Sequence, residues 1–211
     1  MEKRDTKQVI LDEALELFST KGYDGVTVAD LADAVGIKAA SLYKHYKSKQ
    51  EIFDSILVTA AEKYKKMAGQ LGIDGSAYEN DVDKFANMDL DTLIQTGTML
   101  FLHFLHDSYT KKLRRMLTIE QYKNPLAAKL LAIGYNDAPL QYQSALFQAF
   151  INRGKMKHTD AKIAAVQFYS PIYLMLCLCD TYPEREQEAL DYIKQHIIQF
   201  DTAYMNEVEI R

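Results

Sequence analysis

Two short apolar patterns separated by a glycine constrain the fold of this chain more than any other feature. Thr27 precedes apolar residues spaced i, i+3, i+4 and i+7, a pattern typical of a helix that begins with a capping hydroxyl: Val28, Leu31, Ala32 and Val35. Gly36 ends this helix, and a second short helix follows in which Leu42 and Tyr46 share one face. Because two short helices joined by a tight turn can cross steeply, residues 27–46 predict a helix-turn-helix.

Longer helices are predicted on both sides of this motif. Residues 6–20 place apolar side chains on one helix face, and Gly22 is expected to end that helix with a left-handed cap. The residues Ser48-Lys-Gln-Glu51 form a capping-box pattern, so a long helix begins there and runs to about Gly69. Glycine, aspartate and asparagine dominate from there to about residue 87, which indicates a domain boundary or a mobile loop.

The remainder of the chain returns to helical periodicity. Breaks near proline and glycine divide it into helices at about 89–107, 108–121, 125–153, 159–180 and 184–205. Residues 136–139 are expected to kink or divide the third of these. Since no segment shows the alternation typical of strands, the sequence predicts an all-α protein. Its expected parts are a three-helix domain over 1–47, a connecting helix over 48–69 and a larger helical domain over 70–211.

The distribution of charge is more informative than its sum. A net charge of −4 argues against a nucleic-acid binder, because DNA binding neutralises phosphates with lysine and arginine. Residues 34–50, however, contain four lysines and no acidic residue, whereas residues 67–211 contain 14 basic and 18 acidic residues. The short cationic segment coincides with the predicted helix-turn-helix.

The second short helix begins where a helix-turn-helix meets base edges. A lysine and three small residues stand there and let the backbone approach DNA: Lys38, Ala39, Ala40 and Ser41. Tyr43, Lys44 and His45 can reach phosphates or bases from the same element, and Lys49 lies beside the free amides of the next helix. We expect the Thr27 hydroxyl to cap its helix. By spacing alone, the same residues also fit two helices of a bundle with a solvated lysine face.

The sequence FSTKGYDGVTVADLADAVGI at residues 18–37, followed by SLYKHYKSKQEIF at residues 41–53, resembles the tetracycline-repressor (TetR) family. The resemblance covers about residues 6–57. It implies that the second short helix is the recognition helix and that four residues contact DNA: Thr27, Tyr43, His45 and Lys49. Two departures concern the recognition helix, because the family often has serine at position 38 and Gly-Thr or Gly-Ser at positions 40–41. Base preference is therefore not carried over, and an adaptor that no longer reads DNA is an alternative.

The same resemblance implies that the C-terminal helices bind a small-molecule effector and form a homodimer. Helices 159–180 and 184–205 are expected to pair with their copies, through a stripe of apolar and small residues: Ile163, Val166, Ser170, Tyr173, Leu174 and Cys177. Two recognition helices about 34 to 36 Å apart, or a multiple of that, read a palindromic operator in double-stranded DNA. The expected function is a repressor that a ligand releases from its operator by tilting helix 48–69.

Aromatic residues at helical spacings suggest an apolar pocket in the C-terminal part, although ordinary core packing explains most of them equally well. The candidate pocket residues are Phe101, His103, Phe104, Tyr122, Phe147, Phe168 and Tyr169. The spacing of His103, His106 and Asp107 can suit a metal, but pocket polarity or a helix-end histidine is favoured, and no metal is expected. For the basic residues at 111–115, a solvated face or salt bridges are favoured over a second nucleic-acid or anion site.

Other functional classes have little support in the sequence. The motifs GxSxG and HExxH and a phosphate-binding glycine loop are absent, so neither an enzyme nor a cofactor is expected. No uninterrupted apolar run reaches the roughly 18 residues of a membrane span, and the N-terminus carries no targeting signal, so we expect a cytoplasmic protein. Cys177 and Cys179 point to different sides of a helix, which disfavours a joint disulfide or metal site.

Overall fold

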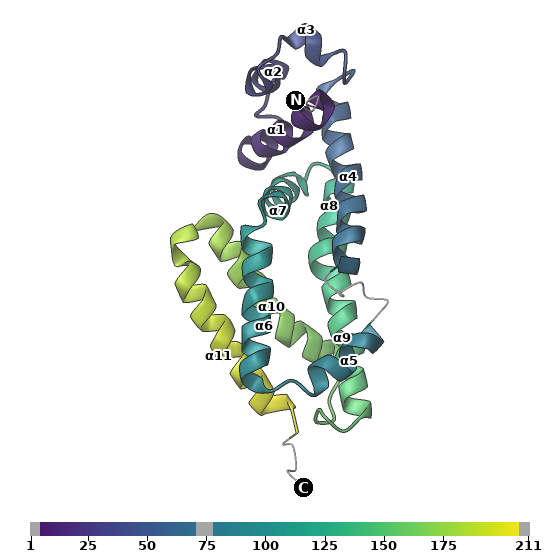
Figure 1. Ribbon diagram of the computed structural model, residues 1–211, viewed down its shortest axis with the longest axis vertical. Coiled ribbons are helices and arrows are strands. Elements are labelled where there is room, and N and C mark those ends of the chain that lie inside the picture. Colours follow the sequence, from purple (N-terminus) through teal and green to yellow (C-terminus); the bar gives the residue numbers. More distant parts are fainter. Residues whose placement is uncertain (1–4, 71–77, 207–211) are drawn as a thin grey trace. The chain divides into compact units, whose positions relative to one another are not determined.

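The computed structural model describes residues 5–70 and 78–206, and side chains within this part except those of residues 63–80. The described residues form helices and contain no strand, in agreement with the predicted all-α class (Figure 1). The helices are α1 Thr6–Lys21, α2 Val28–Val35, α3 Ala39–Leu42, α4 Lys49–Gln70, α5 Tyr78–Ala86, α6 Leu90–His106, α7 Ser108–Glu120, α8 Pro125–Ala132, α9 Ala138–Asn152, α10 Ala161–Thr181 and α11 Glu186–Tyr204.

Most helix boundaries lie close to those predicted, and the differences have local causes. The predicted loop between residues 69 and 87 contains α5, a nine-residue helix that its aspartates and asparagine conceal in the sequence; residues 71–77 lie outside the described part. The predicted break in the helix at 125–153 is a π-helical turn at Ile133–Asp137, and Pro139 follows it in the first turn of α9. The predicted boundaries at residues 48 and 70, which separate the three-helix domain, the connecting helix and the larger helical domain, stay predictions.

By compactness, the chain divides into two units. Unit 1 combines residues 1–65 with residues 108–132, and unit 2 combines residues 66–107 with residues 133–211. Unit 1 therefore holds the predicted helix-turn-helix together with α7 and α8, which are distant in sequence. In the core of unit 1, Phe18 from α1 meets Phe53 from α4 edge to face, with ring centroids 5.5 Å apart. Both side chains are buried, so α1 and α4 are held by packing and not by loop geometry alone.

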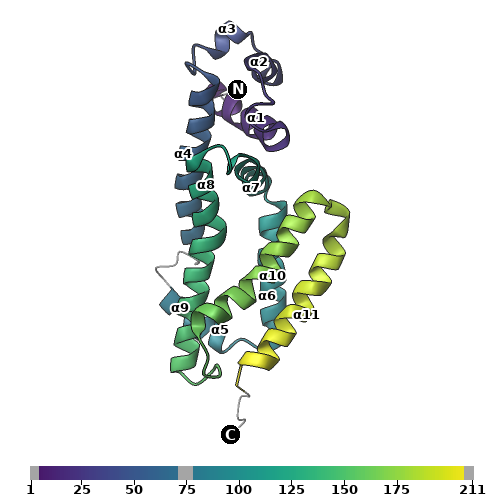
Figure 2. The same cartoon turned by 180° about the vertical axis from the view of Figure 1, so that it is seen from behind.

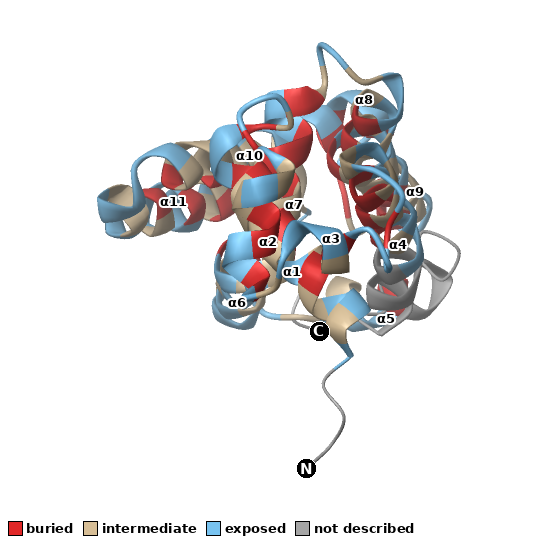
Figure 3. Ribbon diagram, turned by 90° about the horizontal axis from the view of Figure 1, so that it is seen from above, coloured by how far each residue is buried: buried red, intermediate tan, exposed pale blue. Residues whose placement is uncertain are grey.

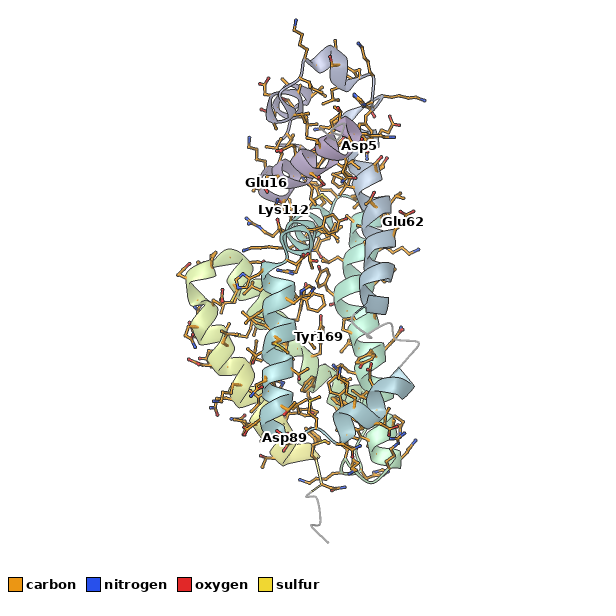
Figure 4. All side chains as sticks on the ribbon, in the orientation of Figure 1. Asp5, Glu16, Glu62, Asp89, Lys112 and Tyr169 are labelled. Atoms are coloured by element: carbon orange, nitrogen blue, oxygen red, sulfur yellow. The ribbon has the colours of Figure 1, made fainter. Side chains whose placement is uncertain are left out.

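Helix α7 packs along α1 within unit 1. Lys112 of α7 forms a 2.8 Å ion pair with Glu16 of α1, and both side chains are labelled in Figure 4. Arg114 is buried, with 1% of its surface exposed. The predicted salt bridge is therefore confirmed at Lys112, whereas Arg114 is not part of a solvated face, because the inner side of α7 is covered.

Unit 2 is built around α10. This helix packs against α9, α6 and α11. Its pairing with α11 is visible from both sides of the molecule in Figure 1 and Figure 2. Phe168 of α10 contacts two groups of core residues, one shared with α9 and the other with α6 and α11. Along α11, buried and exposed residues alternate with the helical period (Figure 3), which indicates that one face of the helix is not covered by the described residues.

Helix α10 is also, among the described residues, the one helix long and apolar enough to cross a bilayer by length and composition. Only 22% of that apolar window is buried in the structure. Pro171 lies inside the helix, where it removes one backbone donor. An apolar, largely uncovered helix of this kind is also typical of a surface that another protein chain covers.

Candidate nucleic-acid interface

Helix α2 is fixed at both ends by the residues that the sequence singles out. The Thr27 hydroxyl accepts the Asp30 amide at 3.1 Å and donates to the Asp30 carboxylate at 2.6 Å, and that carboxylate also accepts the Thr27 amide at 2.8 Å. These bonds hold the pKa of Asp30 below its ordinary value. Gly36 ends the helix in the left-handed conformation, with φ of 76°. The predicted cap is confirmed, and it already uses the hydroxyl proton of Thr27.

Helix α3, the predicted recognition helix, is short. It spans Ala39–Leu42, and Lys38 precedes it without a side-chain capping bond, as the departure from serine at this position predicts. Leu42 and Tyr46 are buried, in agreement with their predicted spacing on one face. The Tyr46 hydroxyl donates to the Lys7 carbonyl at 3.4 Å, and burial raises its pKa to about 12. These two side chains anchor the segment to the core on both sides of its turn.

The residues on either side of Leu42 face solvent. Six candidate contact residues are exposed: Lys38, Ala39, Ala40, Tyr43, Lys44 and His45. Ser41 is half-buried, and Thr27 is exposed. The structure therefore brings the predicted contact residues of α3 and its following turn to one continuous stretch of surface in unit 1, free of acidic side chains along residues 34–50. An exposed cationic stretch of this kind can approach phosphates without like-charge repulsion.

Lys49 is the exception among the candidate residues. It is half-buried, and its ammonium group donates to the carbonyls of Tyr23 and Val26, each at 2.8 Å. The same nitrogen lies 4.0 Å from the centroid of the Tyr23 ring. A lysine ammonium has three donors, so two are used within the protein and one is available to a phosphate. Sequence reasoning identified the position but not this internal role.

The start of α4 differs in detail from the predicted capping box. The Ser48 hydroxyl accepts the Glu51 amide at 3.1 Å, as predicted. The Glu51 carboxylate, however, accepts the amide of Lys47 in place of the amide of Ser48. The Glu51 carboxylate therefore accepts a hydrogen bond from a backbone amide one residue earlier than predicted. The helix still begins where expected, at Lys49.

The loop between α1 and α2 contains contacts that sequence reasoning missed. Glu120 of α7 is buried, and its carboxylate accepts the Tyr23 amide at 2.7 Å. Lys123 pairs with Asp24 at 2.8 Å in an exposed ion pair, which lowers the pKa of Asp24. No local signal identifies these partners, because they are almost one hundred residues apart in sequence.

The predicted pocket residues have different environments in unit 2 and unit 1. Phe101 and Phe147 are buried in the two groups of core residues of unit 2. The rings of Tyr169 and Tyr173 stack, with centroids 6.1 Å apart, and both are half-buried. Tyr122 belongs to unit 1 and is 89% exposed, so its assignment to an enclosed pocket is wrong: it follows the end of α7, where the chain turns through solvent.

The two candidate histidines of α6 are also solvent-facing. His103 is exposed, with Phe104 half-buried beside it, and His106 lies 3.1 Å from the Glu186 carboxylate of α11. Among the residues that the structure describes, no three histidine, cysteine, aspartate or glutamate side chains gather in a metal-binding arrangement. His106 thus has the helix-end position that the sequence favours over a ligand role.

Residues 10–56 match the family model described as bacterial regulatory proteins, tetR family. The same region resembles the negative transcriptional regulator IcaR of the biofilm operon icaADBC: 55% identity over 47 residues in Staphylococcus epidermidis, and 54% over 48 residues in Staphylococcus aureus. These alignments cover 22% and 23% of this chain. The chain thus spans about a quarter of the length of these curated relatives, 25% and 26%.

Solved structures extend the likeness to nearly the whole fold. A TetR transcriptional regulator of Chloroflexus aurantiacus has a TM-score of 0.68 at 18% identity, and the match covers 96% of this chain and 98% of that one. SmeT, the repressor of the multidrug efflux pump SmeDEF of Stenotrophomonas maltophilia, has a TM-score of 0.59 at 17% identity in its complex with triclosan. That match covers 97% of this chain and 93% of SmeT. Because only 18% and 17% of the aligned residues are identical, the likeness to these two structures shows a shared fold.

Proposed function

We propose, on the premise that this chain belongs to the tetR family of bacterial regulatory proteins, that it is a sequence-specific DNA-binding regulator of transcription in the cytoplasm. The observation that carries the proposal is the largely exposed segment of residues 38–45, which contains no acidic side chain and is anchored to the core by the buried side chains of Leu42 and Tyr46. A rigid cationic edge of this size suits the major groove of duplex DNA.

The proposed contacts divide into two classes. Lys38, Ala39, Ala40 and Ser41 approach base edges, since lysine can donate to guanine and small residues let the backbone come close. Tyr43, Lys44, His45 and Lys49 contact phosphates or nearby bases and set the register on the duplex. Thr27 makes its proposed phosphate contact only if its hydroxyl turns from Asp30, because the carboxylate holds that proton at 2.6 Å.

We propose that two copies of the chain associate through α10 and α11 to read a palindromic operator. Both helices carry large apolar side chains that are about half exposed in the single chain: Ile163, Val166, Leu174 and Tyr192. A second copy would cover these faces and bring two recognition helices to one duplex. Leu174→Glu, at a side chain 62% exposed, should therefore give a monomer in light scattering, whereas Met99→Glu, at a side chain 65% exposed on α6, should stay dimeric.

A small-molecule effector is the proposed signal that releases the operator. SmeT has been solved in complex with triclosan, and this complex motivates the search for an apolar effector of the present chain. The pocket candidates that fit this proposal lie in unit 2: Phe104, Phe168 and Tyr169. Effector binding is proposed to tilt α4, which begins at Lys49 beside the DNA-contacting residues. Unchanged operator affinity with every ligand that binds unit 2 would contradict this coupling.

An electrophoretic mobility shift with the DNA upstream of the chain's own gene tests the proposal. The wild-type chain should shift a duplex from this region at a concentration that leaves an unrelated duplex of equal length free. Lys44→Ala should weaken binding to all sequences alike, because a phosphate contact carries no base information. An adaptor whose helix-turn-helix no longer reads DNA would shift both duplexes equally or neither.

A further inference from the structure

The loop of residues 22–26, between α1 and α2, is bound from two sides within unit 1. From one side, the Glu120 carboxylate of α7 accepts the Tyr23 amide at 2.7 Å. From the other side, the Lys49 ammonium of α4 donates to the carbonyls of Tyr23 and Val26, each at 2.8 Å. One peptide segment thus links two helices that are distant in sequence, and it leads directly into Thr27, the first residue of the proposed DNA-binding motif.

Helix α7 packs closely against this loop at Gly22. Gly22 has φ of 70°, and a Cβ atom there would lie 3.1 Å from both the Glu120 Oε1 atom and the Ile119 Cγ2 atom. Glu120 itself is 4% exposed, and a buried carboxylate is costly unless backbone or side-chain donors satisfy it. The contact between Glu120 and Tyr23 is therefore part of the packing between α7 and the loop, not a surface ion pair.

We propose that Glu120 is a positioning residue for DNA binding. Its carboxylate holds the Tyr23 peptide, and two carbonyl groups of the same loop fix the position of the Lys49 ammonium. Loss of the contact with Tyr23 lets the loop move, and Lys49 and Thr27 lose their fixed positions. Glu120 touches no DNA and acts through the loop; the inference rests on the proposed function.

Helix α7, which carries Glu120, follows α6 directly in the chain. Helix α7 begins at Ser108, and one residue separates it from the end of α6 at His106. Helix α6 contributes Phe101 and Leu105 to the core of unit 2 with α10 and α11.

Three variants of Glu120 and one control test the role. Glu120→Met removes the acceptor at similar length, and Glu120→Asp keeps the charge but withdraws the oxygen by one methylene group. Glu120→Gln keeps an acceptor oxygen in place, and should rescue the contact. Lys112→Met is the matched control, because it breaks another contact of α7, the ion pair with Glu16 of α1, without touching the loop.

Two readouts separate positioning from a general loss of stability. Hydrogen exchange at the Tyr23 amide, followed by NMR under native conditions, should speed up by roughly tenfold or more in the Met and Asp variants. For binding to the upstream duplex, the slope of the logarithm of the binding constant against the logarithm of the salt concentration should become shallower by about one unit in the same variants, as for one lost phosphate contact. Glu120→Gln and Lys112→Met should match the wild type in both measurements.

Each other outcome decides against the proposal. Unchanged exchange at Tyr23 in folded Glu120→Met would overturn the contact, and faster exchange with an unchanged salt slope would overturn its positioning role. If Glu120→Met does not fold, Glu120→Asp decides by the same criteria. If the wild-type chain binds no DNA, the proposed function fails and the positioning role fails with it, whereas exchange at Tyr23 still reports on the contact itself.

Discussion

Replacement of Lys49 by alanine should destabilise unit 1 as well as weaken DNA binding. The variant removes two charge-assisted hydrogen bonds of 2.8 Å and leaves the carbonyls of Tyr23 and Val26 without this donor. Hydrogen bonds to charged groups contribute about 1.5 to 3 kcal/mol each, and the contact with the Tyr23 ring adds about 0.5 to 1 kcal/mol. The lower ends of these ranges add up to about 3.5 kcal/mol. Because Lys49 is only half-buried, solvent screens its charge, and we expect a loss of about 2 to 4 kcal/mol.

For a chain of this size such a loss lowers the melting temperature by roughly 5 to 15 °C. Circular dichroism at the helix band measures it, and Lys44→Ala is the control because that side chain is exposed on the same surface. Both variants should lower the salt slope of DNA binding by about one unit, whereas only Lys49→Ala should lower the melting temperature. Equal melting temperatures for Lys49→Ala and the wild type would refute the internal role of Lys49.

Three further predictions concern base reading, buried hydrogen bonding and capping. Lys38→Ala should change the base preferred at one position of each half-site, by about 1 to 3 kcal/mol in competition binding; uniform weakening would exclude base reading there. Tyr142→Phe removes a 2.7 Å hydrogen bond to the buried Asp81 carboxylate and should cost about 1 to 3 kcal/mol in urea unfolding, whereas Tyr122→Phe, at an exposed side chain outside the proposed dimer surface, should cost almost nothing. Because the folded-state pKa of Asp30 is lowered, its carboxylate stabilises the fold above about pH 4, and this stabilisation is lost as the pH falls through the lowered pKa. The difference in unfolding free energy between the wild type and Asp30→Asn should therefore shrink in acid. A difference that stays constant with pH would contradict this.

Local signals in the sequence were sufficient for the helix-turn-helix. Thr27 and Gly36 act on the residues immediately around them, so the cap at one end of α2 and the left-handed turn at the other are visible in the sequence. The missing cap at Lys38 follows from its side chain, which has no acceptor. The apolar spacing of Leu42 and Tyr46 correctly identified the face that is buried.

What the sequence could not show depends on contacts between distant residues. Glu120 and Tyr23 are 97 residues apart, and Lys49 lies 26 residues from the Tyr23 carbonyl that it binds. Neither pairing has a periodic or compositional signature, since a buried glutamate in an amphipathic helix resembles a solvated one until its partner is known. The exposure of Tyr122 is a related case: aromatic character indicated a pocket wall, but the position after the end of α7 decides its environment.

The most direct test of DNA reading by residues 38–45 is selection from a pool of random duplexes with the wild-type chain. The account predicts enrichment of a two-fold-symmetric site whose half-sites lie about 34 to 36 Å, or a multiple of that, apart along the duplex. It also predicts that Lys38→Ala enriches a site altered within each half. Equal retention of all sequences by the wild-type chain, at every salt concentration, would contradict the claim that this surface reads DNA.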